Sequence, residues 1–327
     1  MSKKLILISI IFISCIKFEF ESPYEDANGI YLQWIGSYPI VADKMIIADK
    51  TGYFLDRNPY VSIIEKYIIS TDSCRMISRY IHNGLINDFA IEDDYGFLAI
   101  PSYGLEIINF QGETPFLYGE LALPDGARFI ELSGAYAYII GDSTFYIINI
   151  SDKKAPEKLS EFKFAKKIQD FDISGIFAFI ILEDSCMSMK DVFFILKIEE
   201  KDNPQIIPHS CDDCFKPITV IINNSYVYLL TENNNIQVYK WDGEKNLSAV
   251  TCLLLPTTVN YFFIKENQGF VLGNCIIYLL NLTYPDAPCV SEMINLQGNF
   301  TYGLINKNYI YALSPYLNII EIKEIPK

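Results

Sequence analysis

Short apolar stretches alternate with polar turns along most of the chain, and the pattern returns about every 41 residues. One anchor is a proline, or its substitute, that opens a strand, with steps of 41, 41, 48, 43 and 41 residues: Cys74, Pro115, Pro156, Pro204, Leu247, Pro288. A second anchor, the end of an apolar run, has steps of 41, 41, 49, 42 and 41 residues: Ile91, Leu132, Ile173, Ile222, Ile264, Ile305. Two anchors with the same rhythm indicate one supersecondary unit repeated along the chain.

Each repeat predicts four short strands. The first is typified by residues 136–140, the second by 145–149, the third by 158–162 and the fourth by 171–173. A turn rich in chain-reversing residues, 151–156, precedes the third strand. Strands this short and regular, without a helical period between them, indicate an all-β protein. Four strands in about 41 residues are typical of one β-propeller blade.

The two ends of the chain predict that the array closes into a ring. Seven first strands are expected, near Ile47, Leu98, Tyr138, Phe179, Tyr228, Val271 and Tyr311. The seventh is followed by one more strand, 317–322, so its repeat lacks two strands. Residues 31–35 resemble the missing third strand and residues 40–42 the missing fourth. We therefore predict a seven-bladed propeller over residues 29–327, with N- and C-terminal strands sharing one blade and no open sheet edges.

The N-terminus has the pattern of an export signal. Lys3 and Lys4 precede the apolar stretch 5–13, which is too short to span a bilayer, and Ser14 and Cys15 follow. Residues 12–15 resemble a bacterial lipobox, in which Cys15 becomes the lipidated first residue. This predicts a signal peptide over 1–14, a tether over 15–28 and a lipid anchor in the bacterial envelope, at the outer membrane or cell surface. A plain cleaved signal and an uncleaved anchor are the alternatives.

The charge balance excludes one large class of partner. The chain has 26 basic and 40 acidic residues, a formal net charge of −14. Nucleic-acid binding needs a basic footprint, which this composition does not supply. The acidity instead fits a soluble, mutually repelling surface.

The repeat motif resembles a known family. Residues 135–138, followed by 147–152 and by Ala155-Pro156, look like the LVIVD repeat of bacterial exported propellers, and 104–108 and 279–288 match it more loosely. The resemblance implies a surface or periplasmic propeller, commonly a lipoprotein. It implies no general enzymatic activity, and it offers no catalytic residue that could be transferred to this chain.

Candidate catalytic chemistry is sparse. His82 and His209 are the only histidines, and neither a glycine-rich phosphate loop nor a His-Glu-x-x-His motif occurs. We expect no catalytic residue, cofactor or metal site. The alternative is an enzyme that acts on a small molecule or sugar with carboxylates of the central channel. Four acids on predicted fourth strands suit it, although they fit the solvated side of those strands better: Asp88, Glu131, Asp170, Asp172.

A cysteine cluster lies near the one long step in the repeat. Cys211 and Cys214 form a Cys-x-x-Cys motif beside His209, and Cys186 lies in the insertion 183–191. Both loops should lie on one face of the ring, and exported thiols tend to oxidise. We predict a disulfide between Cys186 and Cys211 or Cys214; a soft-metal site and unpaired thiols are the alternatives.

The longer loops define the binding hypothesis. Loops 49–60, 183–191 and 208–216 are expected on one face, opposite the uniform 151–156 type of turn, and binding in repeat proteins favours the face with insertions. The candidate binding residues are Tyr53, Phe54, Arg57, Tyr60, His82, Met187 and His209. The predicted function is a non-catalytic envelope scaffold that binds a protein or an extracellular polymer. Neutral surface variation in these loops is the alternative.

Overall fold

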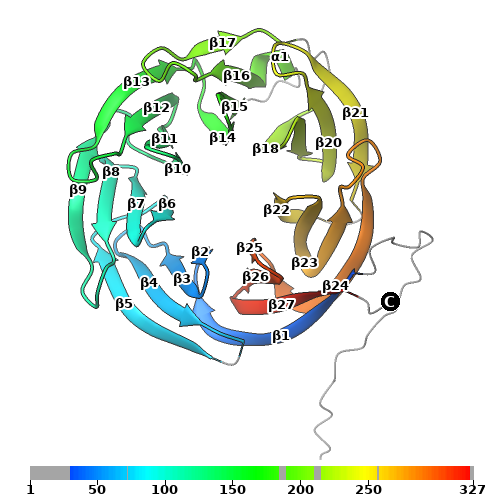
Figure 1. Ribbon diagram of the computed structural model, residues 1–327, viewed down its shortest axis with the longest axis horizontal. Coiled ribbons are helices and arrows are strands. Elements are labelled where there is room, and N and C mark those ends of the chain that lie inside the picture. Colours follow the sequence, from blue (N-terminus) through cyan, green and yellow to red (C-terminus); the bar gives the residue numbers. More distant parts are fainter. Residues whose placement is uncertain (1–29, 72, 184–188, 210–214, 256–257, 325–327) are drawn as a thin grey trace, which may run out of the picture.

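The computed structural model describes residues 30–71, 73–183, 189–209, 215–255 and 258–324. They form seven antiparallel sheets arranged as blades around a central axis (Figure 1), and we call the region that the innermost strands surround the channel. The fold is therefore the all-β, seven-bladed propeller that the repeat predicts. Each blade begins with its innermost strand, and the later strands follow outwards.

Blades 1 to 3 follow this order without exception. Blade 1 contains β2 (Lys44–Ala48), β3 (Thr51–Asp56), β4 (Ser62–Ile69) and β5 (Cys74–His82). Blade 2 contains β6 (Asp88–Glu92), β7 (Tyr95–Ile100), β8 (Gly104–Asn109) and β9 (Phe116–Ala122). Blade 3 contains β10 (Phe129–Ser133), β11 (Tyr136–Ile140), β12 (Thr144–Asn149) and β13 (Glu157–Lys163).

Blades 4 and 5 keep the same order around an insertion. Blade 4 contains β14 (Ile168–Ser174), β15 (Phe177–Leu182), β16 (Phe193–Lys197) and β17 (Gln205–Ile207), with the short helix α1 (Met189–Val192) between its middle strands. Blade 5 contains β18 (Pro217–Asn223), β19 (Tyr226–Thr231), β20 (Asn235–Trp241) and β21 (Leu247–Leu254).

Blades 6 and 7 complete the ring. Blade 6 contains β22 (Val259–Lys265), the long β23 (Gln268–Asn281) and β24 (Cys289–Asn299). The two halves of β23 pair with β22 and β24 respectively, so it supplies both middle strands. Blade 7 contains β25 (Tyr302–Asn306), β26 (Tyr309–Ser314), β27 (Tyr316–Glu324) and, outermost, β1 (Ile30–Val41).

The ring closes as expected, by strands from both ends of the chain, but the strand assignment near the N-terminus was wrong. β1 pairs with β27 from Ile30 opposite Glu324 to Val41 opposite Tyr316. Residues 40–42 form no separate strand, because β1 continues to Val41. Ile47 lies on the innermost strand β2 rather than on the next strand outwards. The N-terminus therefore contributes one strand to blade 7, and the C-terminus contributes three.

The hydrophobic core consists of seven layers, one between each pair of neighbouring blades. Between blades 2 and 3, for example, Phe97 and Ile107 pack with Ile130 and Ile139. The middle strands are buried along nearly their whole length because a blade covers each side of them, as the pattern of β11 shows. The apolar runs of the sequence are these strands.

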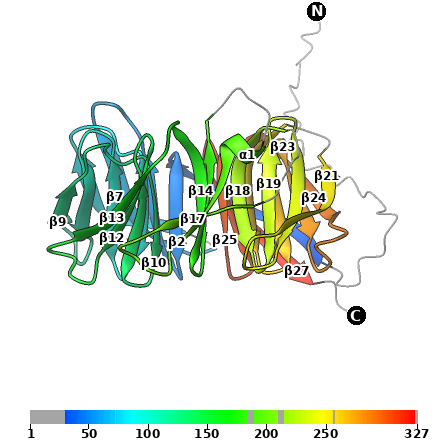
Figure 2. The ribbon, with the colours of Figure 1, turned by 90° about the horizontal axis from the view of Figure 1, so that it is seen from above.

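The antiparallel order gives the ring two different faces, seen edge-on in Figure 2. One face carries the loops between the middle strands of each blade and the connections to the next blade; we call it the insertion face, and α1 lies on it. The other carries the innermost hairpin turns and the turns before the outermost strands; we call it the turn face. The described part of the insertion, which includes α1, lies on the face opposite turns such as 151–156, as predicted. Among the described residues, no helix is long and apolar enough to cross a membrane.

Candidate functional site

The innermost strands place a group of carboxylates around the central channel. Asp88 lies on β6, Glu131 on β10, and Asp170 and Asp172 on β14. All four therefore lie on innermost strands, in agreement with the alternative that placed them near the channel. Asp88 is buried, and the other three are partly exposed.

The channel carboxylates connect neighbouring blades. Oδ2 of Asp88 accepts the N–H of Ile130 at 3.1 Å, and Oδ2 of Asp170 accepts that of Val220 at 2.9 Å. Asp172 accepts the N–H of Ile222 at 2.6 Å, and Glu131 that of Ile173. Each acceptor lies on one innermost strand and each donor on the next. These residues are therefore structural connectors rather than only the solvated side of their strands.

Burial changes the acidity of these groups. Loss of water raises the pKa of Glu131 to about 9, and the nearby Asp172 carboxylate adds to the rise. Burial also raises the pKa of Asp170 to about 7 and that of Asp172 to about 6, although the backbone N–H donors of both residues oppose the change. The channel can therefore hold protons at neutral pH.

Other polar groups surround the carboxylates. Lys44 on β2 forms an ion pair with Asp88. On the opposite side, the rings of Tyr261 and Tyr302 lie 4.6 Å apart between centroids, and burial raises the pKa of both hydroxyls. Among the described residues, no group of three or more His, Cys, Asp or Glu side chains could hold a metal ion together.

The structure corrects two of the candidate binding residues. Residues 51–56 form the strand β3 instead of a long loop, and the side chains of Tyr53 and Phe54 are 1% and 2% exposed. Tyr53 contacts Phe110 of blade 2 edge-on, and Phe54 contacts Tyr67. Both aromatic rings are core, so neither is available to a ligand.

Arg57 and Tyr60 lie on the insertion face, as expected. The backbone N–H of Arg57 donates to Oδ2 of Asp43 at 2.7 Å. Oδ1 of Asn58 accepts the N–H of Tyr60 at 2.9 Å, and Ser62 Oγ donates to the carbonyl of Asn58 at 3.1 Å. These bonds fix the loop while the Tyr60 side chain stays 83% exposed.

The two histidines lie far apart on this face. His82 ends β5, and its Nδ1 is 3.3 Å from Oε2 of Glu106 in blade 2. In blade 4, Nε2 of His209 lies 2.9 Å from the carbonyl oxygen of Phe193, and its ring contacts the Phe193 ring. Because blades 1 and 4 are well separated around the ring (Figure 1), a small ligand would not touch both histidines. Met187, Cys186, Cys211 and Cys214 lie outside the described residues.

Sequence reasoning missed an apolar surface beside Tyr60. Val61 and Ile81 of blade 1 are 40% and 56% exposed, and the paired residues Val41 and Tyr316 of blade 7 are 57% and 48% exposed. All four lie near the insertion-face ends of their strands. Together with Tyr60 they form what we call the blade 7–1 surface. The strand pattern could not reveal it, because its members come from both ends of the chain.

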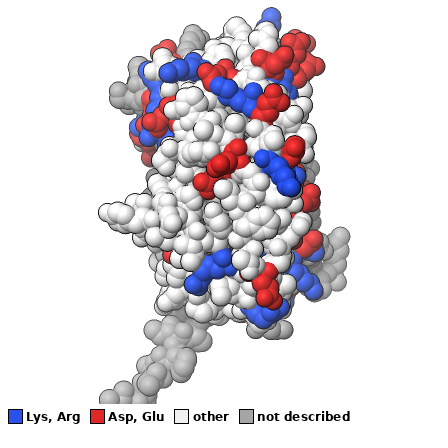
Figure 3. Space-filling view, turned by 90° about the vertical axis from the view of Figure 1, so that its left-hand side faces the viewer, with Lys and Arg blue, Asp and Glu red and all other residues white. Residues whose placement is uncertain are grey.

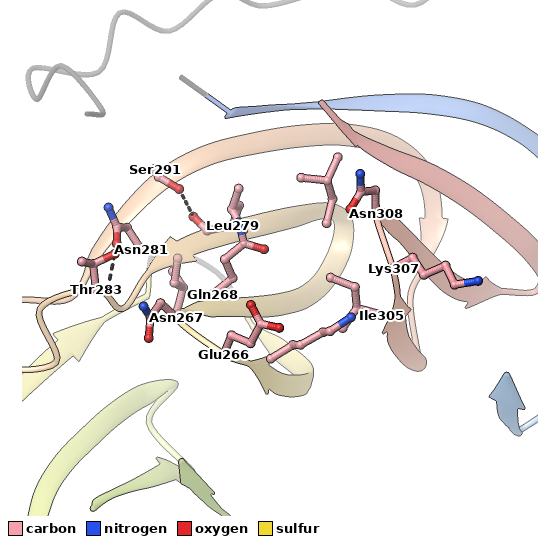
Figure 4. A pocket seen from close by; sticks show the side chains of 13 residues that line it. Glu266, Asn267, Gln268, Leu279, Asn281, Thr283, Ser291, Ile305, Lys307 and Asn308 are labelled. Carbon is pink, nitrogen blue, oxygen red and sulfur yellow. Dashed lines mark hydrogen bonds between the residues drawn. The ribbon is translucent and has the colours of Figure 1, made fainter. Parts of the chain in front are cut away.

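A cavity lies on the opposite face, between blades 6 and 7. It has a volume of about 580 Å³, and we call it the blade 6–7 cleft. Figure 4 shows the blade 6 residues Glu266 and Gln268 on one side and the blade 7 residues Lys307 and Asn308 on the other. Amide, hydroxyl and charged groups therefore surround an apolar base that includes Ile305. No sequence motif marked this cleft.

The outer rim shows a different character from both faces. Seen from the left-hand side of Figure 1, basic and acidic side chains are interspersed with wide uncharged areas (Figure 3). Because both charge signs are mixed here, this side of the rim would give little electrostatic steering to a partner of one charge sign. The two faces and the channel remain the more distinctive regions.

Comparisons with known proteins support the fold and leave the family open. No protein-family model and no curated protein matches the chain, so the LVIVD resemblance stays a prediction. The WD40 domain of coronin from Toxoplasma gondii is similar, with a TM-score of 0.69, 10% identity, and coverage of 92% of this chain and 88% of that one. BamB from Moraxella catarrhalis has a TM-score of 0.58, 10% identity, and coverage of 90% and 99%. The computationally designed Ika8 protein has a TM-score of 0.62, 8% identity, and coverage of 86% and 83%. At such identities these similarities show that this chain has the β-propeller fold.

Proposed function

We propose that this protein is a non-catalytic binding scaffold of the bacterial cell envelope, which recognises a protein or an extracellular polymer through its insertion face. The observation that carries the proposal is Tyr60, a highly exposed aromatic side chain on a loop fixed by hydrogen bonds. A side chain whose backbone is already ordered loses little conformational entropy when it binds. Tyrosine also offers a large apolar ring with a polar end, which suits it to interfaces.

The neighbouring side chains support the same interpretation. Val61 and Ile81 extend the apolar area around Tyr60, and Arg57 adds a cation to a strongly acidic molecule. Exposed apolar groups that gather in one region mark interaction sites more often than isolated ones do. The channel carboxylates favour a scaffold over an enzyme, because backbone donors of the next blade already occupy them.

The proposal includes attachment to a membrane through Cys15. The basic residues, apolar stretch and Ser14-Cys15 pair support export and lipidation. One acyl chain alone binds a membrane marginally, whereas several anchor it firmly. Metabolic labelling with a radioactive fatty acid tests this part: the label should enter the protein and should disappear in Cys15→Ser. Equal labelling of both would contradict it.

Site-specific photo-cross-linking tests the binding face. A benzoylphenylalanine at position 60 should give a cross-linked product on intact cells, whereas the same group at position 116 should not. Phe116 is a matched control, because it is aromatic, 51% exposed and located on the turn face. Tyr60→Ala should weaken binding of the identified partner. Equal cross-linking at both positions, or none at 60, would refute the use of this face.

A further inference from the structure

The blade 6–7 cleft lies where other interfaces of the same ring are filled by a turn. The equivalence follows from one backbone hydrogen bond, in which a residue at the end of a third strand donates its N–H to the innermost hairpin turn. This bond is found in all seven blades, at 2.7 to 2.9 Å: Ile69 to Lys50, Phe110 to Asp94, Ile150 to Ala135, Ile198 to Ile176, Trp241 to Ser225, Leu282 to Asn267 and Ile322 to Asn308. Counting from it gives corresponding positions in every blade.

Lys153, three residues after Ile150, fills this place between blades 3 and 2. Its Nζ lies 3.0 Å from Oε2 of Glu92 and 5.6 Å from the centre of the Tyr95 ring. Its carbonyl oxygen packs so closely on blade 2 that a Cβ added to Gly119 would lie 2.1 Å from it. Both the side chain and the backbone of Lys153 therefore contact the preceding blade.

Lys201, three residues after Ile198, does the same between blades 4 and 3. Its Nζ lies 5.3 Å from the centre of the Tyr136 ring, and its carbonyl oxygen accepts a hydrogen bond of 2.6 Å from Ser160 Oγ. Ser160 occupies the strand position that Gly119 occupies in blade 2. In both interfaces a lysine of the turn before the outermost strand packs against the preceding blade. We call Lys153 and Lys201 the interblade lysines.

Blade 7 offers no such turn among the described residues. Its third strand β27 ends at Glu324, and its outermost strand β1 comes from the other end of the chain. The place that an interblade lysine would occupy is the cleft of about 580 Å³. Counting from the shared hydrogen bond, Lys265 replaces Glu92 and Gln268 replaces Tyr95. The carboxylate that holds Lys153 at the interface of blades 2 and 3 is thus replaced by a cation at the interface of blades 6 and 7.

The backbone on both sides of the cleft is unusual. The first residue of each innermost hairpin turn has a positive φ, and in five blades it is a residue that accepts this conformation readily: Asp49, Asp93, Gly134, Gly175, Asn224. In blades 6 and 7 it is Glu266 and Lys307, both with a φ of 55°. Long side chains adopt this region at a cost. Both residues line the cleft. Strained backbone conformations cluster at functional sites, so the positive φ of these two residues supports a binding role for the cleft.

We propose that the blade 6–7 cleft binds a turn of a partner protein, with an acidic side chain at the position of the interblade lysines. The partner turn would complete blade 7 as the turns of blades 3 and 4 complete theirs. The amides of Asn267, Gln268 and Asn308 can donate to and accept from a peptide backbone. Lys265 faces the acidic side chain. This site is independent of the blade 7–1 surface.

Two peptides based on residues 150–156 are suitable probes. The unaltered segment (Ile-Ser-Asp-Lys-Lys-Ala-Pro) is the basic peptide, and the same segment with Lys153→Glu is the acidic peptide, with its acid at the position of the interblade lysines. With both ends blocked, the acidic peptide should bind the full chain about fivefold more tightly in calorimetric titration. Lys265→Glu, which restores the acid of blade 2, should reverse the preference. Tighter binding of the basic peptide would also show that the variant is folded.

Three results would overturn the proposal. The first is no binding of either peptide at millimolar concentration, and the second is an unchanged preference in Lys265→Glu. The third is binding only to a variant that ends at Glu324, because residues 325–327 would then be the occupant. Tyr60→Ala should bind the acidic peptide like the unmodified protein, so failure here is distinguishable from failure of the insertion-face proposal.

Discussion

Blades 2 to 4 and blades 6 and 7 share one architecture but differ in how their neighbours are joined. In blades 2 to 4, channel carboxylates connect the innermost strands, and interblade lysines fill the turn face. In blade 6, the amide of Asn260 donates to the carbonyl oxygen of Phe300 at 3.0 Å, and the turn face opens into a cleft. The apolar layers between the blades are alike, so the difference lies at the two ends of each interface.

This comparison separates what holds the ring together from what distinguishes one blade from another. Apolar burial contributes about 1.5–3 kcal/mol for each fully buried large side chain, and every interface has many. Polar contacts at the faces are fewer and vary from blade to blade. Function is therefore to be sought where the polar contacts are incomplete.

The largest losses of stability should come from core substitutions, and they should be equal at the 2–3 and 6–7 interfaces. Ile139→Ala, between blades 2 and 3, and Leu272→Ala, between blades 6 and 7, each remove a side chain that is fully buried. Each should lower the free energy of unfolding by about 2–5 kcal/mol in denaturant titrations. A much smaller loss for Leu272→Ala would show that the 6–7 interface is weak throughout, and not only at its cleft.

The second prediction concerns pH and separates the regions. The pKa of Glu131 is about 9 in the folded protein, above its ordinary value of 4.5, so the folded state binds more protons than the unfolded state between these pH values. Stability should then fall as pH rises from about 4.5 through 9. Glu131→Gln keeps an acceptor for the N–H of Ile173 and should flatten this dependence by roughly 1–2 kcal/mol. Melting temperatures at pH 5.5 and 8.5 test this; parallel profiles would contradict it.

The third prediction compares the corresponding charged residues of the two regions. Lys153→Ala should destabilise the protein by about 0.5–1 kcal/mol, because it removes an ion pair and a ring contact from a partly buried position. Lys265→Ala should change stability by less, since no structural turn depends on Lys265. Chemical denaturation of both variants is the measurement. Equal losses would mean that Lys265 already has a structural role.

The smallest expected effect on stability is that of Tyr60→Ala, within about 0.5 kcal/mol, because the side chain is exposed. Its effect should appear in binding alone. A large fall in the melting temperature would show that Tyr60 supports the loop and would weaken its assignment to a binding surface.

The sequence was sufficient for the fold because the repeat is a packing signal. Residues 136–140 and 145–149 are apolar throughout, since two neighbouring blades cover β11 and β12. The same logic failed at β3. Because Ile47 was assigned to the wrong strand, residues 51–56 were predicted to be a loop with Tyr53 and Phe54 exposed. In the structure these residues form β3, which pairs with β2, and both side chains are buried.

The candidate sites were less predictable because they depend on which blades meet. The chain positions of Asp88 and Asp170 suggested a channel, but their hydrogen bonds to Ile130 and Val220 connect residues 42 and 50 positions apart. The cleft depends on the residue that replaces Glu92 in blade 6. The repeat anchors Ile91 and Ile264 directly precede Glu92 and Lys265, but only the structure shows that a turn of the next blade contacts Glu92 and that a cleft lies beside Lys265.

The pairing of Ile30 with Glu324 also sets the order of events when the chain is made. Of the described strands, β1 is the first to be synthesised and the last to find its partner. At about 5–20 residues per second, roughly 15–60 s separate the completion of β1 from that of β27. During that interval the hydrogen-bonding edge of β1 is unsatisfied, and an unpaired strand edge invites association with other chains. The contact that closes the finished ring therefore exposes the growing chain to association with other chains. Correct folding then requires that residues 30–41 stay unpaired or protected until β27 has been synthesised.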